Sequence, residues 1–131
     1  MGRHVLVPMD DSEPARAALD HALEWVPADR LTVVHAVDDL TADYAGIVAA
    51  DDEPDFFADA RATAAEFGRS LETAVVEGEG AAEAILEYVD EADVDAVVMG
   101  SEGKAGVSRL LLGSVAEGVA RRAEVPVTIV P

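Results

Sequence analysis

Short apolar runs alternate along the whole chain with segments in which apolar residues recur at helical spacing. The runs lie at residues 4–9, 31–37, 71–76, 95–99 and 125–130. The helical segments between them span about residues 13–26, 54–68, 81–92 and 114–122. This strict alternation predicts an α/β fold with a doubly wound, five-stranded parallel sheet, right-handed crossovers and helices on both faces.

Length and composition restrict the class of protein further. With 131 residues, 50% of them hydrophobic, the chain fits one compact domain over residues 1–131. The absence of cysteine excludes disulfides, thiolate metal sites and cysteine nucleophiles. No apolar stretch approaches the roughly 18 residues of a membrane span, and the N-terminus does not resemble a signal peptide. We therefore expect a soluble, cytoplasmic protein.

The charge balance is strongly acidic, with 27 acidic residues, nine basic residues and a net charge of −18. Such a field repels nucleic acid and anionic membranes, so we expect neither as a partner. Because the acidic residues are scattered along the chain, they suggest a solvated acidic coat of the kind used by halophilic organisms. A localised cation site is the less favoured alternative.

In an open parallel sheet, ligands bind beyond the carboxyl ends of the strands, where the strand order reverses. Asp10 and Asp11 follow the first run, and together they could hold Mg²⁺. Asp11 and Ser12 can also cap the helix that follows, and we favour the cap role for Asp11. For Asp10 we favour a role in the cleft.

The fourth strand is followed by a glycine-rich segment over residues 100–113. Its glycines would let backbone N–H groups approach a phosphate chain, although they could equally form only a tight turn. Ser114, with Glu117 three residues later, predicts a capping box and a helix start at Ser114. A helix N-terminus at this edge of the sheet would favour an anion. The segment is neither a Walker loop nor a dinucleotide fingerprint.

Three segments together resemble the universal stress protein family. They are VLVPMDDSEPARAALDHAL near the N-terminus, HAVD at 35–38, and MGSEGKAGVSRLLLGSVAEGVARRAEVPVTIVP at the C-terminus. The nucleotide-binding branch of that family carries Gly, two residues, Gly, nine residues, then Gly with Ser or Thr. Gly100, Gly103, Gly113 and Ser114 meet this spacing. The resemblance implies a Rossmann-like fold of the adenine nucleotide alpha hydrolase type.

The resemblance also implies a nucleotide site and a function. The implied function is that of an ATP-binding regulatory module of the stress response with slow or no hydrolysis and no catalytic residue. ATP, with Mg²⁺ or Mn²⁺, would lie between the first and fourth strands, and Asp10 would face the ribose or a metal bound through the nucleotide. Members usually form homodimers through the last strand, here Val127 to Val130. The other matching positions are Pro8, Ala36 and Met99 near the adenine and ribose, and Gly100, Ser101, Gly103, Lys104, Gly113, Ser114 and Val115 around the phosphates.

One residue departs from the family pattern, and several alternatives follow from the sequence. Glu102 stands where a neutral or basic residue is usual, which leaves open a dimeric stress protein of the same fold that binds no nucleotide. A receiver domain is excluded because the third strand does not end in aspartate. An adenylating enzyme would need a Ser-Gly-Gly loop after the first strand. The three histidines read as surface or strand-end residues, and Trp25, Tyr88, Phe56 and Phe57 as packing residues.

Overall fold

The computed structural model describes residues 2–38, 53–101 and 112–131 of the 131-residue chain. Strands and helices alternate in the predicted order, and their ends fall within two residues of the expected positions. Proline and glycine set several of these ends, as at Pro8, Gly68 and Gly113. The elements are β1 (His4–Pro8), α1 (Glu13–Trp25), β2 (Arg30–Asp38), α3 (Asp55–Glu66), β3 (Glu72–Gly78), α4 (Ala81–Glu91), β4 (Ala96–Gly100), α5 (Ser114–Arg122) and β5 (Val127–Val130).

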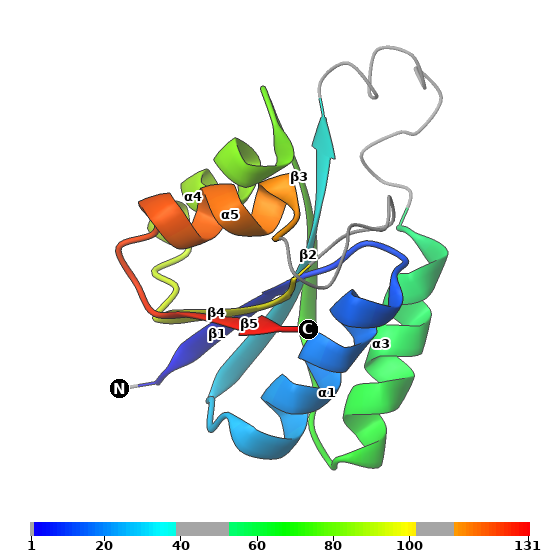
Figure 1. The fold of residues 1–131 in the computed structure, drawn as a ribbon. Coiled ribbons are helices and arrows are strands. Elements are labelled where there is room, and N and C mark those ends of the chain that lie inside the picture. Colours follow the sequence, from blue (N-terminus) through cyan, green and yellow to red (C-terminus); the bar gives the residue numbers. More distant parts are fainter. Residues whose placement is uncertain (1, 39–52, 102–111) are drawn as a thin grey trace.

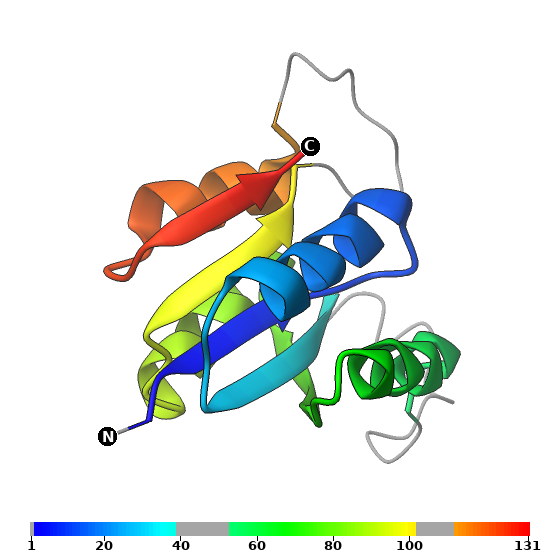
Figure 2. The same cartoon turned by 90° about the horizontal axis from the view of Figure 1, so that it is seen from below.

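The five strands form one parallel sheet in the order β3-β2-β1-β4-β5. The chain runs outward from β1 to β3, returns to the middle at β4 and continues outward to β5. Figure 2 shows β5, in red, at one edge of this sheet. The predicted doubly wound parallel sheet is therefore confirmed, and the strand order reverses between β1 and β4.

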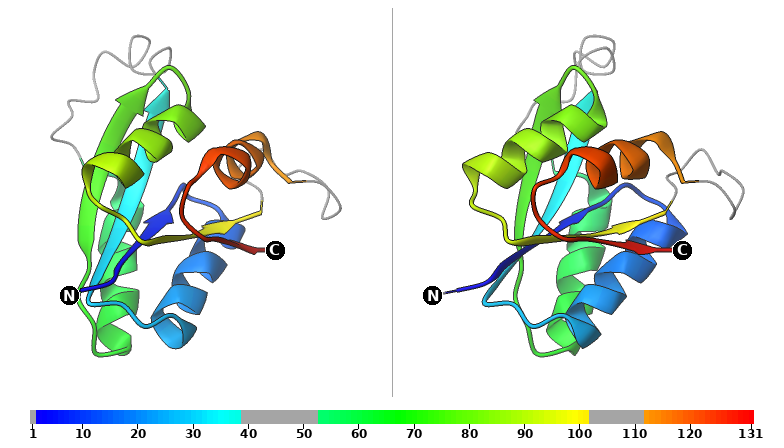
Figure 3. Two further views of the ribbon diagram at one scale, coloured as in Figure 1. Left: turned by 90° about the vertical axis from the view of Figure 1, so that its left-hand side faces the viewer. Right: turned by 60° about the vertical axis from the view of Figure 1, so that its left-hand side comes forward.

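Helices cover both faces of the sheet, as Figures 1 and 3 show. Alternate residues of each strand point to opposite faces, so the core has two layers. Val5, Val7 and Val33 pack with α1 and α3 on one face. Leu6 and Val97 pack with α4 and α5 on the other. The central strands are buried on both faces, which explains why their sequences are continuous apolar runs.

Arg69 fixes the carboxyl end of α1 from the connection between α3 and β3. Its guanidinium donates to the carbonyl oxygens of Ala22, Leu23 and Val26 at 3.3, 3.1 and 3.4 Å, and to that of Ala28 at 3.2 Å. The last carbonyls of a helix lack intrahelical partners, so a cation there satisfies them and complements the helix dipole.

Two side chains differ from their expected positions. Trp25 was expected to pack, but its side chain is 69% exposed because it lies beside the apolar stripe of α1. His4 was expected at a strand end or at the surface. It is the first residue of β1, but it is only 2% exposed. Its Nε2 lies 2.7 Å from Thr32 Oγ1 and its Nδ1 lies 3.1 Å from the carbonyl oxygen of Ala92. These partners allow a polar ring to lie inside the core.

Candidate nucleotide site

β1 and β4 pair over a shorter length than their neighbours do. The β1–β4 register contains two residue pairs, Val5↔Ala96 and Leu6↔Val97, whereas β1 and β2 pair over five. Pro8 explains where the pairing stops. The Met9 N–H donates to Val34 of β2 at 2.8 Å, so the preceding residue would direct its N–H toward β4. Proline has no N–H, and the two strands separate at their carboxyl ends (Figure 2).

The three residues expected near adenine and ribose lie on one face of the sheet, toward α4 and α5. Ala36 and Met99 belong to the core layer on that face. Pro8 shares the face because it lies two residues after Leu6 in β1. Met99 is 5% exposed, so only a small part of its side chain could touch a ligand, whereas Ala36 is half-buried.

Asp10 and Asp11 have different partners, and of the two candidate caps of α1, Asp11 and Ser12, the structure has Ser12. The Ser12 hydroxyl accepts from the Ala15 N–H at 3.3 Å and is the N-cap of α1. The prediction that Asp11 caps the helix was therefore wrong. Its carboxylate pairs instead with Arg16, one turn into the helix. The Asp10 carboxylate accepts from the Ser12 hydroxyl at the edge where β1 ends.

Gly100 lies directly against the first turn of α1. A Cβ added at Gly100 would lie 2.7 Å from the backbone carbon of Pro14 and 2.9 Å from its oxygen. Real Cβ atoms do not come this close to backbone atoms, so the approach of α1 to β4 requires glycine here. This packing requirement is a sufficient reason for the glycine, whether or not a phosphate lies nearby.

Ser101 and Gly113 lie side by side although eleven residues separate them in the sequence. The Gly113 N–H donates to the Ser101 carbonyl at 2.7 Å, and the Ser101 N–H donates to the Val130 carbonyl at 2.8 Å. The end of β4 is thereby joined to both the start of α5 and the end of β5. Both N–H groups were predicted phosphate donors, and both are engaged within the protein.

Helix α5 begins at Ser114, as predicted, but not through a capping box. Gly113 is the N-cap and has no side chain to cap with, and Glu117 pairs with Arg121 at 3.0 Å. The prediction of a capping box was wrong because Gly113, and not Ser114, occupies the N-cap position. Ser114 is therefore the first helical residue. No described residue accepts a hydrogen bond from the N–H groups of Ser114, Val115 or Ala116. Three donors of the first turn thus have no acceptor among the described residues, near the end of β4 to which Gly113 is bonded.

Gly103, Lys104 and Glu102, which the sequence placed around the phosphates, lie outside the described residues. Within the described part, no group of three or more histidine, aspartate or glutamate side chains could hold a metal ion unaided. Mg²⁺ usually takes one or two carboxylates and completes its shell with phosphates and water. The Asp10 carboxylate at this edge could supply one ligand to a metal that arrives with a nucleotide.

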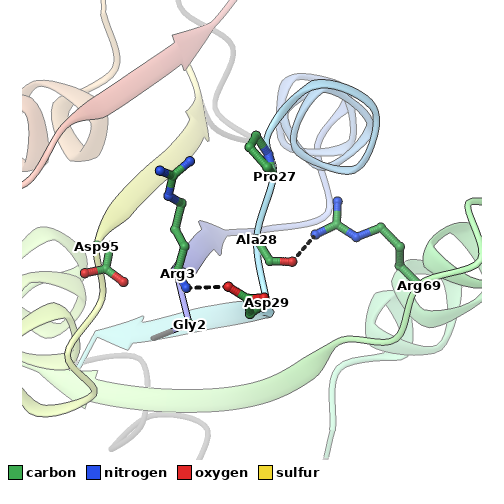
Figure 4. Close-up of a pocket in the computed structure, with 7 residues that line it drawn as sticks. All are labelled: Gly2, Arg3, Pro27, Ala28, Asp29, Arg69 and Asp95. Carbon is green, nitrogen blue, oxygen red and sulfur yellow. Dashed lines mark hydrogen bonds between the residues drawn. The ribbon is translucent and has the colours of Figure 1, made fainter.

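The open pocket shown in Figure 4 lies at the opposite, amino edge of the sheet. It has a volume of about 770 Å³ and is lined by residues that precede the strands: Gly2, Arg3, Pro27, Ala28, Asp29, Arg69 and Asp95. Asp29 accepts from the Arg3 N–H at 2.8 Å, and Asp95 accepts from the His4 N–H at 2.8 Å. These contacts hold the strand starts together, so we assign the pocket's polar groups a structural role.

Sequence reasoning missed His35, whose ring lies at the site edge. Its Nδ1 lies 3.0 Å from the Met9 carbonyl oxygen, next to Asp10. Its ring packs in a T-shaped arrangement with that of Phe56, at a centroid distance of 5.2 Å. The one available signal was its place near the end of the second strand, which did not distinguish it from His4 or His21.

A doubly wound parallel sheet with this strand order and a switch point between β1 and β4 defines a Rossmann-like α/β protein. The model of the universal stress protein family matches residues 1–131, and the chain belongs to this family. Universal stress protein YxiE of Bacillus subtilis is 31% identical over 151 residues, covering 99% of each chain. Universal stress protein MJ0531 of Methanocaldococcus jannaschii is 45% identical over 67 residues, 51% of this chain and 39% of that relative.

Solved structures with the same fold include nucleotide complexes. The crystal structure of a universal stress protein in complex with cAMP has a TM-score of 0.75 and 29% identity, covering 99% of this chain and 97% of that one. A universal stress protein from Archaeoglobus fulgidus in complex with dAMP has a TM-score of 0.68 and 23% identity, covering 98% of both chains. No helix in the described ranges has the length and apolar character that crossing a membrane requires.

Proposed function

We propose that the protein binds an adenine nucleotide between the carboxyl ends of β1 and β4 and acts as a regulatory module of the stress response. ATP, with Mg²⁺ or Mn²⁺, is the ligand that the sequence favours. The proposal assigns no catalytic residue, so hydrolysis is slow or absent. Binding rather than turnover then carries the signal.

The observation that carries the proposal is the first turn of α5 beside the separated strands. Ser114, Val115 and Ala116 have N–H groups with no acceptor among the described residues. A helix N-terminus presents such donors together with the positive end of the helix dipole, which favours a phosphate. The cAMP complex of a relative that is 29% identical supports an adenine ligand.

When bound, a divalent cation would neutralise phosphate charge that the acidic protein otherwise repels. Asp10 is the residue that would hold it, because its carboxylate lies at the end of β1. The Ser12 hydroxyl donates to that carboxylate, and the Ala15 N–H donates to the hydroxyl in turn. The chain of contacts orients Asp10 before any ligand arrives.

The second candidate is a stress protein of this fold that binds no nucleotide. Gly100 is required by the packing of α1, and the N–H groups of Ser101 and Gly113 are already engaged. The packing and the hydrogen bonds of the fold therefore account for Gly100 and for the N–H groups of Ser101 and Gly113 without a bound phosphate. Binding data decide between the two candidates.

The test removes one candidate donor at a time from α5. Ser114→Pro deletes the N–H, and proline suits the first position of a helix, particularly after an extended residue such as Gly113 with ψ 157°. Ser114→Ala removes only the hydroxyl. Hydrogen bonds to charged groups contribute about 1.5–3 kcal/mol, so Ser114→Pro should weaken nucleotide binding at least about tenfold. Calorimetric titration with ATP, AMP and cAMP at high salt, with and without Mg²⁺, measures this.

The matched control is Ala81→Pro, which likewise places proline at the first position of a helix, here α4. It should leave nucleotide affinity within about twofold of the unmodified protein, given that 1.4 kcal/mol corresponds to one decade. Equal losses from Ala81→Pro and Ser114→Pro would count against a site at α5. If the unmodified protein binds none of the three nucleotides below millimolar concentration, the nucleotide-free candidate is the better account.

We further propose that two copies pair through β5, residues Val127–Val130, which lies at the edge of the sheet. An unpaired apolar edge favours aggregation, and pairing with a second copy satisfies it. The Pro126 carbonyl accepts from Val97 of β4, and the Val130 carbonyl accepts from Ser101 just after β4. The backbone polar groups of the even-numbered residues therefore point toward β4, and those of Val127 and Ile129 point away from it. Proline at Thr128 would therefore remove a hydrogen bond between β4 and β5 within the sheet itself.

Val127→Pro removes an outward donor and keeps apolar bulk, so it should convert a dimer into a folded monomer. Thr128→Val, which retains its N–H, should stay dimeric. Sedimentation equilibrium distinguishes these states, and a monomeric unmodified protein would refute the pairing.

A further inference from the structure

His35 of β2 contacts the residue that immediately precedes Asp10. The Met9 N–H donates to the Val34 carbonyl at 2.8 Å, and the Met9 carbonyl lies 3.0 Å from His35 Nδ1. Both backbone polar groups of Met9 are thus bonded to consecutive residues of β2. The Met9 carbonyl belongs to the Met9–Asp10 peptide plane, so the contact with His35 fixes the direction in which the chain enters Asp10.

The donor in this contact can be assigned from its chemistry. A carbonyl oxygen only accepts, so His35 Nδ1 carries the proton and donates it to Met9. A ring protonated at Nδ1 can make this hydrogen bond, and a side chain without a donor at that position cannot.

The imidazole ring is itself held in place. Its edge-on contact with Phe56 has an interplanar angle of 83°, and Phe56 meets Phe57 at a centroid distance of 5.4 Å. Phe57 is 1% exposed in the core layer under α1 and α3. A line of aromatic rings therefore connects the half-buried His35 to the core.

Asp10 is consequently fixed from two directions. His35 holds its backbone through Met9, and the hydroxyl of Ser12 donates to its carboxylate. A group that must meet a ribose or a cation within a few tenths of an ångström depends on such supporting contacts.

We propose that His35 is a positioning residue for nucleotide binding, which acts through the Met9 carbonyl to place the Asp10 carboxylate toward the ribose or the bound cation. The inference rests on the proposed function and adds to it the residue that orients the Asp10 carboxylate.

A double-mutant cycle tests this role. The variants are His35→Leu, Asp10→Asn and the two combined, and the measurement is the Kd for ATP with Mg²⁺ by calorimetry at high salt. His35→Leu should weaken binding about tenfold in the unmodified background. In the Asp10→Asn background the same change should weaken it by less than about twofold, because residues that act through one another are not additive.

Two further variants separate positioning from general stability. His35→Asn keeps a side-chain N–H near the Nδ1 position and should restore most of the affinity. His21→Leu makes the same chemical change on α1, away from the site, and should leave the Kd unchanged. Thermal melting of each variant verifies that it is folded at the temperature of the titration.

The outcomes separate the inference from the function on which it rests. Non-additive losses with rescue by His35→Asn support the positioning role. Nucleotide binding by the unmodified protein with fully additive losses overturns the role of His35 and leaves the proposed function intact. Failure of the unmodified protein to bind nucleotide overturns both.

Discussion

At the residue scale, Gly100 and Pro14 show how closely α1 approaches the end of β4. The first turn of the helix lies where any side chain at residue 100 would have to be. The same contact places Asp10 and Ser12, at the head of α1, beside the strand end that leads to Ser101. One small residue thus determines how near the two halves of the candidate site can come.

Gly100→Ala should destabilise the fold by about 1–3 kcal/mol, because the new Cβ would overlap the Pro14 backbone and force α1 to move. The measurement is the free energy of unfolding in urea at high salt. Gly80→Ala is the control, since a Cβ there would meet nothing within 4 Å. An unchanged free energy of unfolding for Gly100→Ala would contradict the packing role.

Single residues were the least predictable from the sequence. The glycines at the end of the fourth strand were recognised, but the contact of Gly100 with Pro14 joins parts of the chain far apart in sequence. Two adjacent residues, Asp11 and Ser12, could cap α1, and the local pattern does not show that Ser12 rather than Asp11 does so. His35 acquires its role only when β2 lies beside β1.

At the element scale, two helices end in the same way with different residues. α3 is closed by Gly68 at φ 69°, with Arg69 N–H bonded to Ala64 O at 2.9 Å. α4 is followed by Asp93 at φ 53°, with Val94 N–H bonded to Val89 O at 3.0 Å. Both are left-handed caps, but an aspartate pays a conformational cost that glycine does not.

Asp93→Gly should therefore stabilise the protein by about 1 kcal/mol. It relieves the left-handed backbone and removes a negative charge from the negative end of the helix dipole. Asp93→Asn removes the charge alone and should give a smaller gain. Urea unfolding of the three proteins gives both differences, and a glycine variant no more stable than the unmodified protein would contradict the assignment.

The elements themselves were well predicted, because helical and strand periodicity are local properties of the sequence. The largest differences are at ends, where the third strand extends to Gly78 and the last strand begins at Val127. Cap and turn contacts with other elements decide those positions. The strand order β3-β2-β1-β4-β5 could not be predicted in the same way, because the alternation of strands and helices predicts a parallel sheet but not the order of its strands. Only the family resemblance placed the site between the first and fourth strands.

At the scale of the whole molecule, the net charge of −18 opposes compaction. The described arginines form five ion pairs with carboxylates, and every one has exposed partners. Exposed pairs contribute little, so they do not offset the repulsion among the remaining acidic residues. Stability should then depend on the ions in solution.

We expect the melting temperature at pH 7 to rise as KCl increases from about 10 mM to about 1 M, because the Debye length falls from roughly 30 Å to roughly 3 Å. Differential scanning calorimetry across the series measures the rise. A flat or falling melting temperature would contradict the halophilic interpretation of the acidic surface.

The dependence of the melting temperature on salt should also weaken near the isoelectric pH of about 4.2, where the net charge is small. A hydrogen bond from Arg30 lowers the pKa of Glu72, and one from Arg61 lowers the pKa of Glu53. A lowered folded-state pKa contributes stability above the unfolded-state pKa, and that contribution disappears as the pH falls through the folded-state value. These two pairs should therefore persist while other carboxylates become protonated and the mutual repulsion declines.

The hydrogen bond from Gly113 to Ser101 has a consequence for how such proteins diversify. It joins the two backbone points between which the glycine-rich sequence runs, and both points are anchored in the sheet and in α5. The entropy of closing a loop rises only with the logarithm of its length, by about 0.6 kcal/mol for each doubling. Insertions or exchanges between these anchors therefore cost little closure entropy. Exchange of the sequence between these two points would keep the anchors in the sheet and at the start of α5.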